Sequence, residues 1–280
     1  MSALYERRVV VAPDEPSFGA YAPNRLQSAL LALAHVPPFY RGVLRRPMAN
    51  LVRALGRTPV IDLTKKGVSF RLRQGTNLIE DGILVHPAYN SVEIDFLREG
   101  TPVGGVFVDL GANIGLYTLP LARKAGPSGR VLAIDANPDI VKALEFNIAA
   151  SKLDNVTVAC VAVGDSAGRA RLEIRKADLA IVEVADDPEG EIEIKPLAEI
   201  ARDAGIDHID TLKADIEGFE DRAILPLLDG HPALHPGRIV IEHLTRDQWR
   251  SDLLAAFARH GYRLVGKTRG NSLYEKAARS

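Results

Sequence analysis

The sequence predicts an α/β protein with a parallel β-sheet. From residue 105 onward, short runs of Val, Ile and Leu alternate with helix-like segments. This alternation is typical of parallel strands joined by right-handed crossovers. The composition is ordinary for a globular chain, with 46% hydrophobic and 25% charged residues in 280. A strand, a turn containing glycine and a helix follow one another over 106–125, and ligands of such sheets bind where the strands end.

Composition and length exclude several classes of protein. A chain of 280 residues can bury a full core, and its apolar content excludes a disordered or fibrous protein. The single cysteine, Cys160, excludes an intramolecular disulfide and indicates a reducing compartment without a thiolate metal site. No apolar run reaches the roughly 18 residues of a membrane span. The first residues lack the long apolar stretch of a signal peptide, so we expect a cytoplasmic protein.

The N-terminal part of the chain is basic. Residues 1–75 contain 12 Lys and Arg against 4 Asp and Glu, whereas residues 76–280 contain 23 against 32. Apolar residues at three- and four-residue steps predict two helices over 24–57, separated at Pro37-Pro38. The second helix carries five arginines: Arg41, Arg45, Arg46, Arg53 and Arg57. Such a segment can make peripheral contact with a membrane, form a lid with a solvated face, or simply pack on the acidic body.

Alternating apolar and polar residues predict strands between 60 and 86, which we interpret as a small antiparallel unit, followed by a helix at 91–99. In the body we expect strands at 106–110, 130–135, 156–163, 211–216 and 238–242, and a final hairpin of 263–267 and 272–275. Helices are expected at 117–125, 138–151, about 220–228 and 247–260. Asn137 is suited to cap the second of these, with Pro138 in its first position. The acidic stretch 177–195 interrupts the alternation and is interpreted as a solvated insertion.

The loop after the strand at 106–110 is the most informative segment. Gly111 permits a sharp turn and the close approach of a ligand, and Gly115 begins the helix without a side chain. Asp135 ends the next strand, 20 residues after Gly115, where a carboxylate can accept hydrogen bonds from both hydroxyls of a ribose. The alternative for Asp135 is a purely structural interaction with the N-terminus of the helix at 138–151.

Two cofactors fit a ribose-binding carboxylate: a dinucleotide and S-adenosylmethionine. The loop departs from the G-x-G-x-x-G pattern of dinucleotide sites, because Asn113 stands at the second glycine. Asp109 precedes the first glycine by two residues. A carboxylate there suits the sulfonium and ammonium cations of S-adenosylmethionine better than it suits a diphosphate. The loop therefore favours S-adenosylmethionine.

Acidic residues and one histidine follow the later strands. They are Asp215, Glu217, Glu242 and His243. Because the carboxyl ends of neighbouring parallel strands meet at one edge, we expect these side chains to converge on one crevice. His243 has the ordinary pKa best suited to a base near neutral pH, although a structural histidine is an equal alternative. Carboxylates with a histidine are also compatible with Mg²⁺, but the spacing does not require it and no metal is assigned.

Four segments resemble the FkbM family of S-adenosylmethionine-dependent methyltransferases. They are Asp-Leu-Gly-Ala-Asn-Ile-Gly (109–115), Ala-Ile-Asp-Ala-Asn-Pro (133–138), Ala-Val-Gly-Asp (162–165) and Leu-Lys-Ala-Asp-Ile-Glu-Gly-Phe-Glu (212–220). They occur in the family's order and spacing, within about residues 90–275, and the last is the most discriminating. The resemblance implies a class I, Rossmann-like methyltransferase fold with seven strands, the last antiparallel, and helices on both faces. It also implies methyl transfer to a hydroxyl, often of a sugar or a secondary metabolite.

The resemblance also implies roles for individual residues. Asp109, Gly111, Asn113 and Gly115 match the cofactor loop, Asp135 the ribose-binding acid, and Asp165 a residue near the adenine. Asp215, Glu217 and Glu242 match acids at the ends of the fourth and fifth strands. We accordingly divide the chain into an N-terminal helical lid with a small β extension (1–90) and a cofactor-binding catalytic domain (91–280).

Three departures from the family pattern concern substrate recognition. Lys195-Pro-Leu-Ala-Glu199 replaces a Thr-Leu-Asp-like element, Tyr89 and Glu93 are four residues apart rather than adjacent, and the first 75 residues have no counterpart. The expected acceptor is a hydroxyl of a carbohydrate, glycolipid or secondary metabolite.

Three alternative functions remain. The first is a nucleic-acid methyltransferase that uses the basic segment as a phosphate-binding arm, although the Asn- or Asp-Pro-Pro-aromatic turn of amine methyltransferases is absent from the sequence. The second is an NAD-dependent oxidoreductase, which Asp109 and Asn113 disfavour. The third is a binding protein that keeps the fold without the chemistry.

Overall fold

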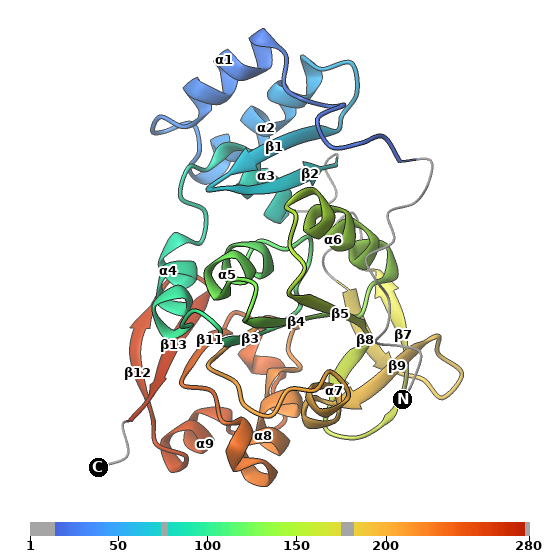
Figure 1. Ribbon diagram of the computed structural model, residues 1–280, viewed down its shortest axis with the longest axis vertical. Helices are drawn as coiled ribbons and strands as arrows, with labels where there is room; N and C mark the ends of the chain where they lie inside the picture. The colour runs from blue at the N-terminus through green and yellow to red at the C-terminus, as the bar shows by residue number, and fades with distance from the viewer. Residues whose placement is uncertain (1–14, 74–77, 175–181, 278–280) are drawn as a thin grey trace.

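The computed structural model describes residues 15–73, 78–174 and 182–277 and is centred on a seven-stranded sheet (Figure 1). In spatial order the strands are β12 (Tyr262–Lys267), β13 (Asn271–Lys276), β11 (Arg238–Glu242), β10 (Thr211–Ala214), β3 (Val106–Leu110), β4 (Arg130–Asp135) and β5 (Val156–Cys160). Neighbouring strands are parallel except that β13, the last strand of the chain, runs antiparallel to β11 and β12. The expected mostly parallel sheet with an antiparallel last strand is confirmed.

Helices cover both faces of this sheet (Figure 1). One face carries α4 (Ser91–Gly100), α5 (Thr118–Ala125) and α6 (Pro138–Ala150), and the other carries α7 (Leu197–Asp203), α8 (Glu220–Gly230) and α9 (Leu253–Arg259). Alternate residues of each strand enter two separate apolar clusters: Phe107 packs with α4–α6, and Val108 packs with α7–α9. The sequence analysis missed α7, which buries Leu197 and Ile200 against the second cluster.

The N-terminal residues fold into helices around a two-stranded sheet. The elements are α1 (Arg25–Ala34), η1 (Gly42–Leu44), α2 (Arg45–Ala54), β1 (Ile61–Lys65), β2 (Val68–Leu72) and α3 (Leu78–Val85). The two predicted helices and the antiparallel strand pair are confirmed. The prediction of strand up to residue 86 is wrong, because 78–85 is helical. Gly82 suggested a break, but the glycine is needed for packing, since a Cβ there would lie 2.5 Å from the Tyr89 ring.

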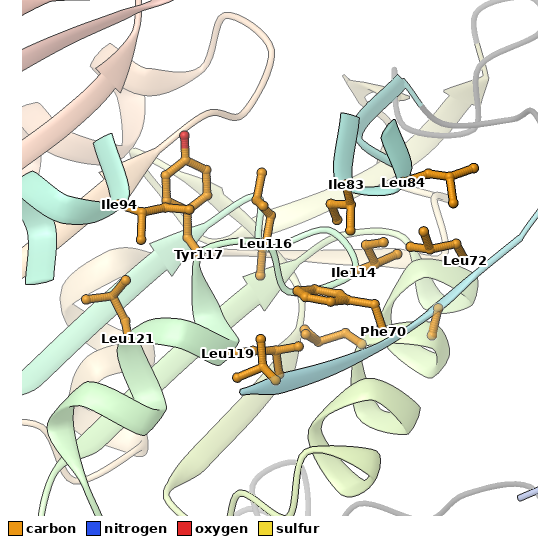
Figure 2. Packing of buried hydrophobic residues seen from close by; sticks show 14 of the residues in the cluster. Phe70, Leu72, Ile83, Leu84, Ile94, Ile114, Leu116, Tyr117, Leu119 and Leu121 are labelled. Atoms are coloured by element: carbon orange, nitrogen blue, oxygen red, sulfur yellow. The ribbon is translucent and has the colours of Figure 1, made fainter. Parts of the chain in front are cut away.

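This N-terminal part shares one apolar cluster with the body (Figure 2). Phe70 and Ile83 pack in the same cluster as Ile114 and Leu119, which belong to the loop after β3 and to α5. Buried hydrogen bonds also join the two parts: the Arg71 backbone N–H donates to Asn147 Oδ1 of α6 at 2.7 Å. The division of the chain at residue 90 stays a prediction.

Half of the exposed large apolar side chains in the described residues gather on the N-terminal helices. They are Leu26, Leu33, Val36, Val43, Leu44, Leu51 and Leu55. No Asp or Glu occurs between residues 16 and 61, so the charges on this surface are cationic. The expected membrane contact of 24–57 stays a prediction. None of the helices in the described ranges has the length and apolar composition needed to cross a bilayer.

A second, four-stranded sheet corrects two predictions. It contains β6 (Ala162–Gly164), β9 (Ile192–Pro196), β7 (Gly168–Ile174) and β8 (Val182–Asp186), in that order. The predicted strand 156–163 is therefore two strands, because the chain leaves the central sheet after Cys160. The acidic stretch is largely strand rather than a solvated insertion, although 177–181 lies outside the described residues. Ile192 and Ile194 are buried at alternate positions, a period-two pattern that the intervening acids obscured.

The predicted helix 247–260 is shorter than expected. After the single turns η2 (Pro232–Leu234) and η3 (Arg246–Gln248), α9 begins only at Leu253. Asp252 caps it, because its side chain accepts a hydrogen bond from the Ala255 backbone N–H at 2.9 Å. An N-cap aspartate five residues beyond the expected start thus determines where the helix begins.

Candidate functional site

The carboxyl ends of four neighbouring strands finish at the same level. Leu110 of β3 pairs with Ile134 of β4 and with Ala214 of β10, and Ala214 pairs with Ile241 of β11. The next residues of these strands form one row: Asp135, Gly111, Asp215 and Glu242. Three of the four positions are carboxylates, so the register of the sheet places the predicted acids side by side at its ligand-binding edge.

Gly111 is required because two loops approach each other closely. Its φ is +71°, and a Cβ at this position would lie 1.9 Å from the Asp215 carbonyl oxygen. No other residue fits without moving the backbone after β10. Asn113, also left-handed at φ +49°, directs its backbone N–H to Asp135 Oδ2 at 2.9 Å. The loop is thus fixed by the residues on either side of it.

A cavity opens beside this loop. Its wall has acidic and polar groups next to an apolar surface from β4, the β5–β6 segment and the loop after β10. The lining residues are Gly111, Asn113, Ile134, Asp135, Ala136, Asn137, Ile140, Val161, Ala162, Val163, Asp215, Ile216, Glu217 and Phe219. The combination of an apolar wall with a few convergent polar groups is typical of small-molecule sites.

Asp135 lines this cavity and is held by two backbone N–H groups. Its Oδ2 accepts the Asn113 N–H and its Oδ1 accepts the Asn137 N–H at 3.0 Å. Each oxygen keeps a further lone pair, so the carboxylate can still accept hydrogen bonds from two hydroxyls. Burial raises the pKa of Asp135, while the two backbone N–H groups act in the opposite direction. The hydrogen bond from Asn137 is the structural interaction with the start of α6 that we considered as the alternative role of Asp135. It leaves the other lone pairs of the carboxylate open for a ligand.

Three predicted cofactor residues do not line the cavity. Asp109 is fully buried on the α4–α5 face, where its Oδ2 accepts the Thr118 hydroxyl at 2.6 Å, so it cannot face a cation in the cavity as we expected. Gly115 has a packing role, since a Cβ would lie 2.9 Å from side-chain carbons of Leu119 and Leu144. Asp165 is about half exposed and lies 3.6 Å from the Arg222 guanidinium. The acids beside the cavity are Asp135, Asp215 and Glu217 instead.

Lys213 is a buried cation beside Asp109 and Asp215. Its side chain is 3% exposed, and its Nζ lies 3.5 Å from Asp109 Oδ1 and 3.9 Å from Asp215 Oδ2. The ammonium also donates to the carbonyl oxygens of Leu110 and Gly111, at 3.0 and 2.6 Å. Burial lowers the pKa of Lys213, but Asp109, Asp215 and Asp135 raise it more, so it stays charged. Asp109 is the closer of its two carboxylate partners.

Glu242 and Glu217 are the other predicted acids at this edge of the sheet. Glu242 is half-buried and accepts the Thr245 hydroxyl at 3.2 Å. Burial together with the charges of Asp215 and Glu217 raises the pKa of Glu242 to about 8. Glu217 has a left-handed backbone, with φ +55°, in the turn that follows β10. Glu242 can therefore exchange a proton near neutral pH.

His243 lies on the other face of the sheet. Its Nδ1 is 3.0 Å from the Ser272 hydroxyl, and Ser272 is the cross-strand partner of Ile241, which packs with α7–α9. Glu242, one residue earlier, is paired with Asn271 on the opposite face. The structure therefore does not bring His243 together with the three acids, and Glu242 replaces it as the candidate base.

The contacts of several residues around the site were not predicted from the sequence. Glu93 of α4 accepts the Thr268 hydroxyl and the Asn271 amide, at 2.5 and 3.2 Å, and ties the helix to the end of β13. Tyr117 is buried and accepts a hydrogen bond from the Asn90 side chain. These contacts cross at least 27 positions of the sequence, so no local pattern could reveal them.

Glu220 holds the turn that carries the acids. Its Oε1 accepts the Ile216 N–H at 2.8 Å and its Oε2 accepts the Trp249 indole N–H at 2.8 Å. One signal was available, because an acid in the first turn of a helix can accept backbone N–H groups of the preceding loop. Among the described residues, no group of three His, Cys, Asp or Glu side chains is arranged to hold a metal ion.

Comparisons with known proteins place this geometry in context. No curated protein matches the chain. Among solved structures, the chain is similar to M. jannaschii TYW2 in complex with AdoMet, with 19% identity and a TM-score of 0.40 over 78% of this chain and 87% of that one. A SAM-dependent O-methyltransferase from Thermotoga maritima has 18% identity and a TM-score of 0.41 over 71% of each chain. A putative methyltransferase from Streptococcus mutans in complex with SAH has 12% identity and a TM-score of 0.42 over 67% and 97%.

The family comparison is more specific than these likenesses of fold. The model of the FkbM methyltransferase domain matches residues 109–264, which is more than half of the chain and includes the glycine loop, Asp135 and the acids after β10 and β11. The strand order and the antiparallel last strand are those of the class I methyltransferase fold that the resemblance implied. The chain therefore belongs to the FkbM methyltransferase domain family, whose cofactor is S-adenosylmethionine.

Proposed function

We propose that this protein transfers a methyl group to a hydroxyl oxygen of a small-molecule or glycan acceptor. The observation that carries the proposal is the row of Asp135, Asp215 and Glu242 at the carboxyl ends of neighbouring strands. Within this row, burial and the neighbouring acids raise the pKa of Glu242 to about 8. A hydroxyl must lose its proton as it is methylated, and a base is most effective when its pKa lies near the working pH. A carbohydrate, glycolipid or secondary-metabolite hydroxyl meets this requirement.

The residues of the cavity fit S-adenosylmethionine. Asp135 offers open lone pairs for the ribose hydroxyls, the Gly111 backbone leaves no side chain between loop and ligand, and Ile134, Val161 and Val163 form an apolar wall suited to adenine. Asp215 and Glu217 supply negative charge for the cationic end of the cofactor. When bound, the cofactor supplies an activated methyl group whose bond to sulfur breaks as the new carbon–oxygen bond forms.

The chain has three tasks in this reaction. The loop of Gly111 and Asn113 together with Asp135 binds the cofactor and fixes its orientation. Asp215 and Glu217 orient the acceptor by accepting hydrogen bonds from its hydroxyls. Glu242 receives the proton of the attacking hydroxyl at a carboxylate oxygen, so the acceptor leaves as a neutral methyl ether. Glu220 and Trp249 keep the turn that presents these acids in place.

Methyl transfer with tritium-labelled S-adenosylmethionine tests the proposal. Purified protein is offered sugars, glycolipids and hydroxylated natural products, and the labelled product is examined for a methyl ether. Label in an ether supports the proposal, and label only in an amine or in RNA would reject it in favour of the nucleic-acid alternative. Calorimetric titration with NAD in parallel addresses the oxidoreductase alternative, since NAD binding without S-adenosylmethionine binding would reject the cofactor assignment.

Asp135→Ala is expected to weaken S-adenosylmethionine binding about 30-fold. The change removes a charge-assisted acceptor for the ribose hydroxyls, which is worth about 2 kcal/mol, and tenfold in affinity corresponds to about 1.4 kcal/mol. Calorimetric titration measures the dissociation constant. Asp139→Ala is the matched control, because Asp139 is an exposed carboxylate in the first turn of α6 that pairs with Lys142 on the surface. Equal affinities of the Asp135 variant and the control would exclude the ribose role.

A further inference from the structure

Five cationic or titratable side chains gather on the N-terminal side of the acceptor site. They are His35 after α1, Arg41 and Arg45 around η1, Lys65 at the end of β1 and His86 after α3. Burial lowers the pKa of His86, and the charges of Lys65, Arg45 and Arg41 lower it further. The five residues come from separate segments of the chain, so the fold brings them together.

Aromatic rings fix the mutual positions of these groups. The rings of Tyr40 and His86 are in edge contact with centroids 4.5 Å apart, and the rings of His86 and Tyr89 are 6.0 Å apart. The Arg41 guanidinium lies 5.2 Å from the Tyr40 ring centroid, and the Arg45 guanidinium lies 5.6 Å from that of Tyr89. Arg41, Arg45 and His86 are thus connected through the rings of Tyr40 and Tyr89. We call these three residues, together with His35 and Lys65, the cationic ladder.

Among the residues that the structure describes, no ion pair joins a carboxylate to His35, Arg41, Arg45, Lys65 or His86. Arg53, eight residues after Arg45, instead forms a buried ion pair with Asp81, with Nη1 and Oδ1 2.5 Å apart. The Lys65 ammonium donates instead to the carbonyl oxygens of Ile83 and His86, and burial together with Lys66 lowers its pKa to about 8. Cations that repel one another reduce the stability of the isolated protein. The same cations interact favourably with an anion that binds between them.

Tyr89 connects the ladder to the acids. Its ring stacks against the Gly82 backbone, its phenol is influenced by Arg45 on one side and by Asp215 and Glu93 on the other, and burial raises its pKa. Tyr89 and Lys65 also line an apolar cavity with Ile94 and Leu116. Asn90, the residue after Tyr89, donates a hydrogen bond to the Tyr117 hydroxyl at 2.9 Å, and the Tyr117 ring centroid lies 5.4 Å from Lys213 Nζ. These contacts connect the cations to the row of acids, and Lys65 and Tyr89 place them beside an apolar cavity.

We propose that Arg41, Arg45 and His86, with Lys65 beside them, bind a phosphate group of the acceptor. The inference rests on the proposed function, because it assigns the acceptor to the class of phosphate esters. Several converging cations suit a phosphate dianion better than a single carboxylate, and Arg presents paired N–H groups to its oxygens. A soluble sugar phosphate and a lipid-linked phosphate share this chemistry.

Titration of the full-length protein with inorganic phosphate, without cofactor or acceptor, tests the site. We expect saturable binding by calorimetry and a dissociation constant at least tenfold higher for Arg45→Gln, since a hydrogen bond to a charged group is worth about 1.5–3 kcal/mol. Arg57→Gln is the matched control: Arg57 is exposed, follows the same helix and has no ring contact within the described residues. We expect its phosphate affinity to equal that of the wild type.

Thermal unfolding separates a ligand-binding role from a structural one. Arg45→Gln relieves repulsion among the cations, so its Tm is expected to equal or exceed that of the wild type while phosphate affinity falls. Absence of phosphate binding, or equal loss in Arg45→Gln and Arg57→Gln, would overturn the proposal. Because no methyl transfer is measured, this failure is distinct from failure of the proposed function.

Vesicles distinguish the two sources of phosphate. If phosphatidic acid vesicles retain the protein, phosphatidylcholine vesicles do not, and retention falls in Arg45→Gln, the phosphate is lipid-borne. If free phosphate binds but neither vesicle retains the protein, the acceptor is a soluble phosphate ester. Both results support the site. RNA binding that Arg45→Gln and Arg57→Gln weaken equally would instead indicate a diffuse nucleic-acid surface and would reject it.

Discussion

Lys213→Met is expected to lower the free energy of unfolding by about 3–5 kcal/mol, because breaking a buried ion pair leaves an uncompensated charge. Lys213 Nζ lies between the carboxylates of Asp109 and Asp215 and also holds the last carbonyl groups of β3. Without it, Asp109 keeps only the Thr118 hydroxyl as a partner in a fully buried position. Denaturation by urea, monitored by circular dichroism, measures the loss.

A second substitution distinguishes an ion-pair effect from a packing effect. Asp109→Asn in the Lys213→Met background removes the stranded charge, so part of the lost stability should return. Lys213→Met alone should also bind S-adenosylmethionine more weakly, because the Gly111 carbonyl oxygen loses its hydrogen bond from Lys213. Lys142→Met is the control, since Lys142 is an exposed lysine that pairs with Asp139 on the surface. Equal stabilities of the Lys213 and Lys142 variants would show that the buried cation contributes nothing to folding.

The row of acids shows which part of the site could be predicted from the sequence. Asp135 and Glu242 each follow an apolar run directly, and Asp215 follows the buried strand Thr-Leu-Lys-Ala. Parallel pairing of the strands then requires the three acids to lie together. The two-residue period of a β-strand also indicates on which face of the sheet each side chain lies. Asp109 is two residues from the inward-facing Phe107, and His243 is one residue from Glu242. Side-chain alternation therefore predicts that Asp109 is buried and that His243 lies on the other face.

Other features depended on contacts between distant segments. Gly82 lies inside helix α3, where the Tyr89 ring leaves no room for a Cβ. Glu93 faces Thr268 and Asn271 across 175 and 178 positions of the chain. The cationic ladder appeared in the sequence only as a basic segment. Its function depends on which cations lack a carboxylate, and that is determined by tertiary structure.

Glu242→Gln is expected to lower kcat about 10²–10³-fold, the usual contribution of a positioned general base. Burial and the charges of Asp215 and Glu217 raise the pKa of Glu242 to about 8, so the basic form increases with pH. The wild-type rate should therefore rise with pH and level off above about 8, and the variant should lose this dependence. Because the acids interact, the profile reports the titration of the cluster rather than of one group. Measured turnover between pH 6 and 10 gives both curves.

The stability of Glu242→Gln distinguishes a loss of catalysis from a loss of folded protein. Between the unfolded pKa near 4.5 and the folded pKa of about 8, the folded protein retains a proton that the unfolded chain has released. The wild type therefore loses stability as pH rises through this range, and Glu242→Gln, which cannot ionise, should be at least as stable at pH 8. Loss of activity with retained or increased Tm assigns the effect to chemistry. If Glu242→Gln retains turnover and His243→Ala loses it, the base is His243, and the acceptor must approach from the other face of β11.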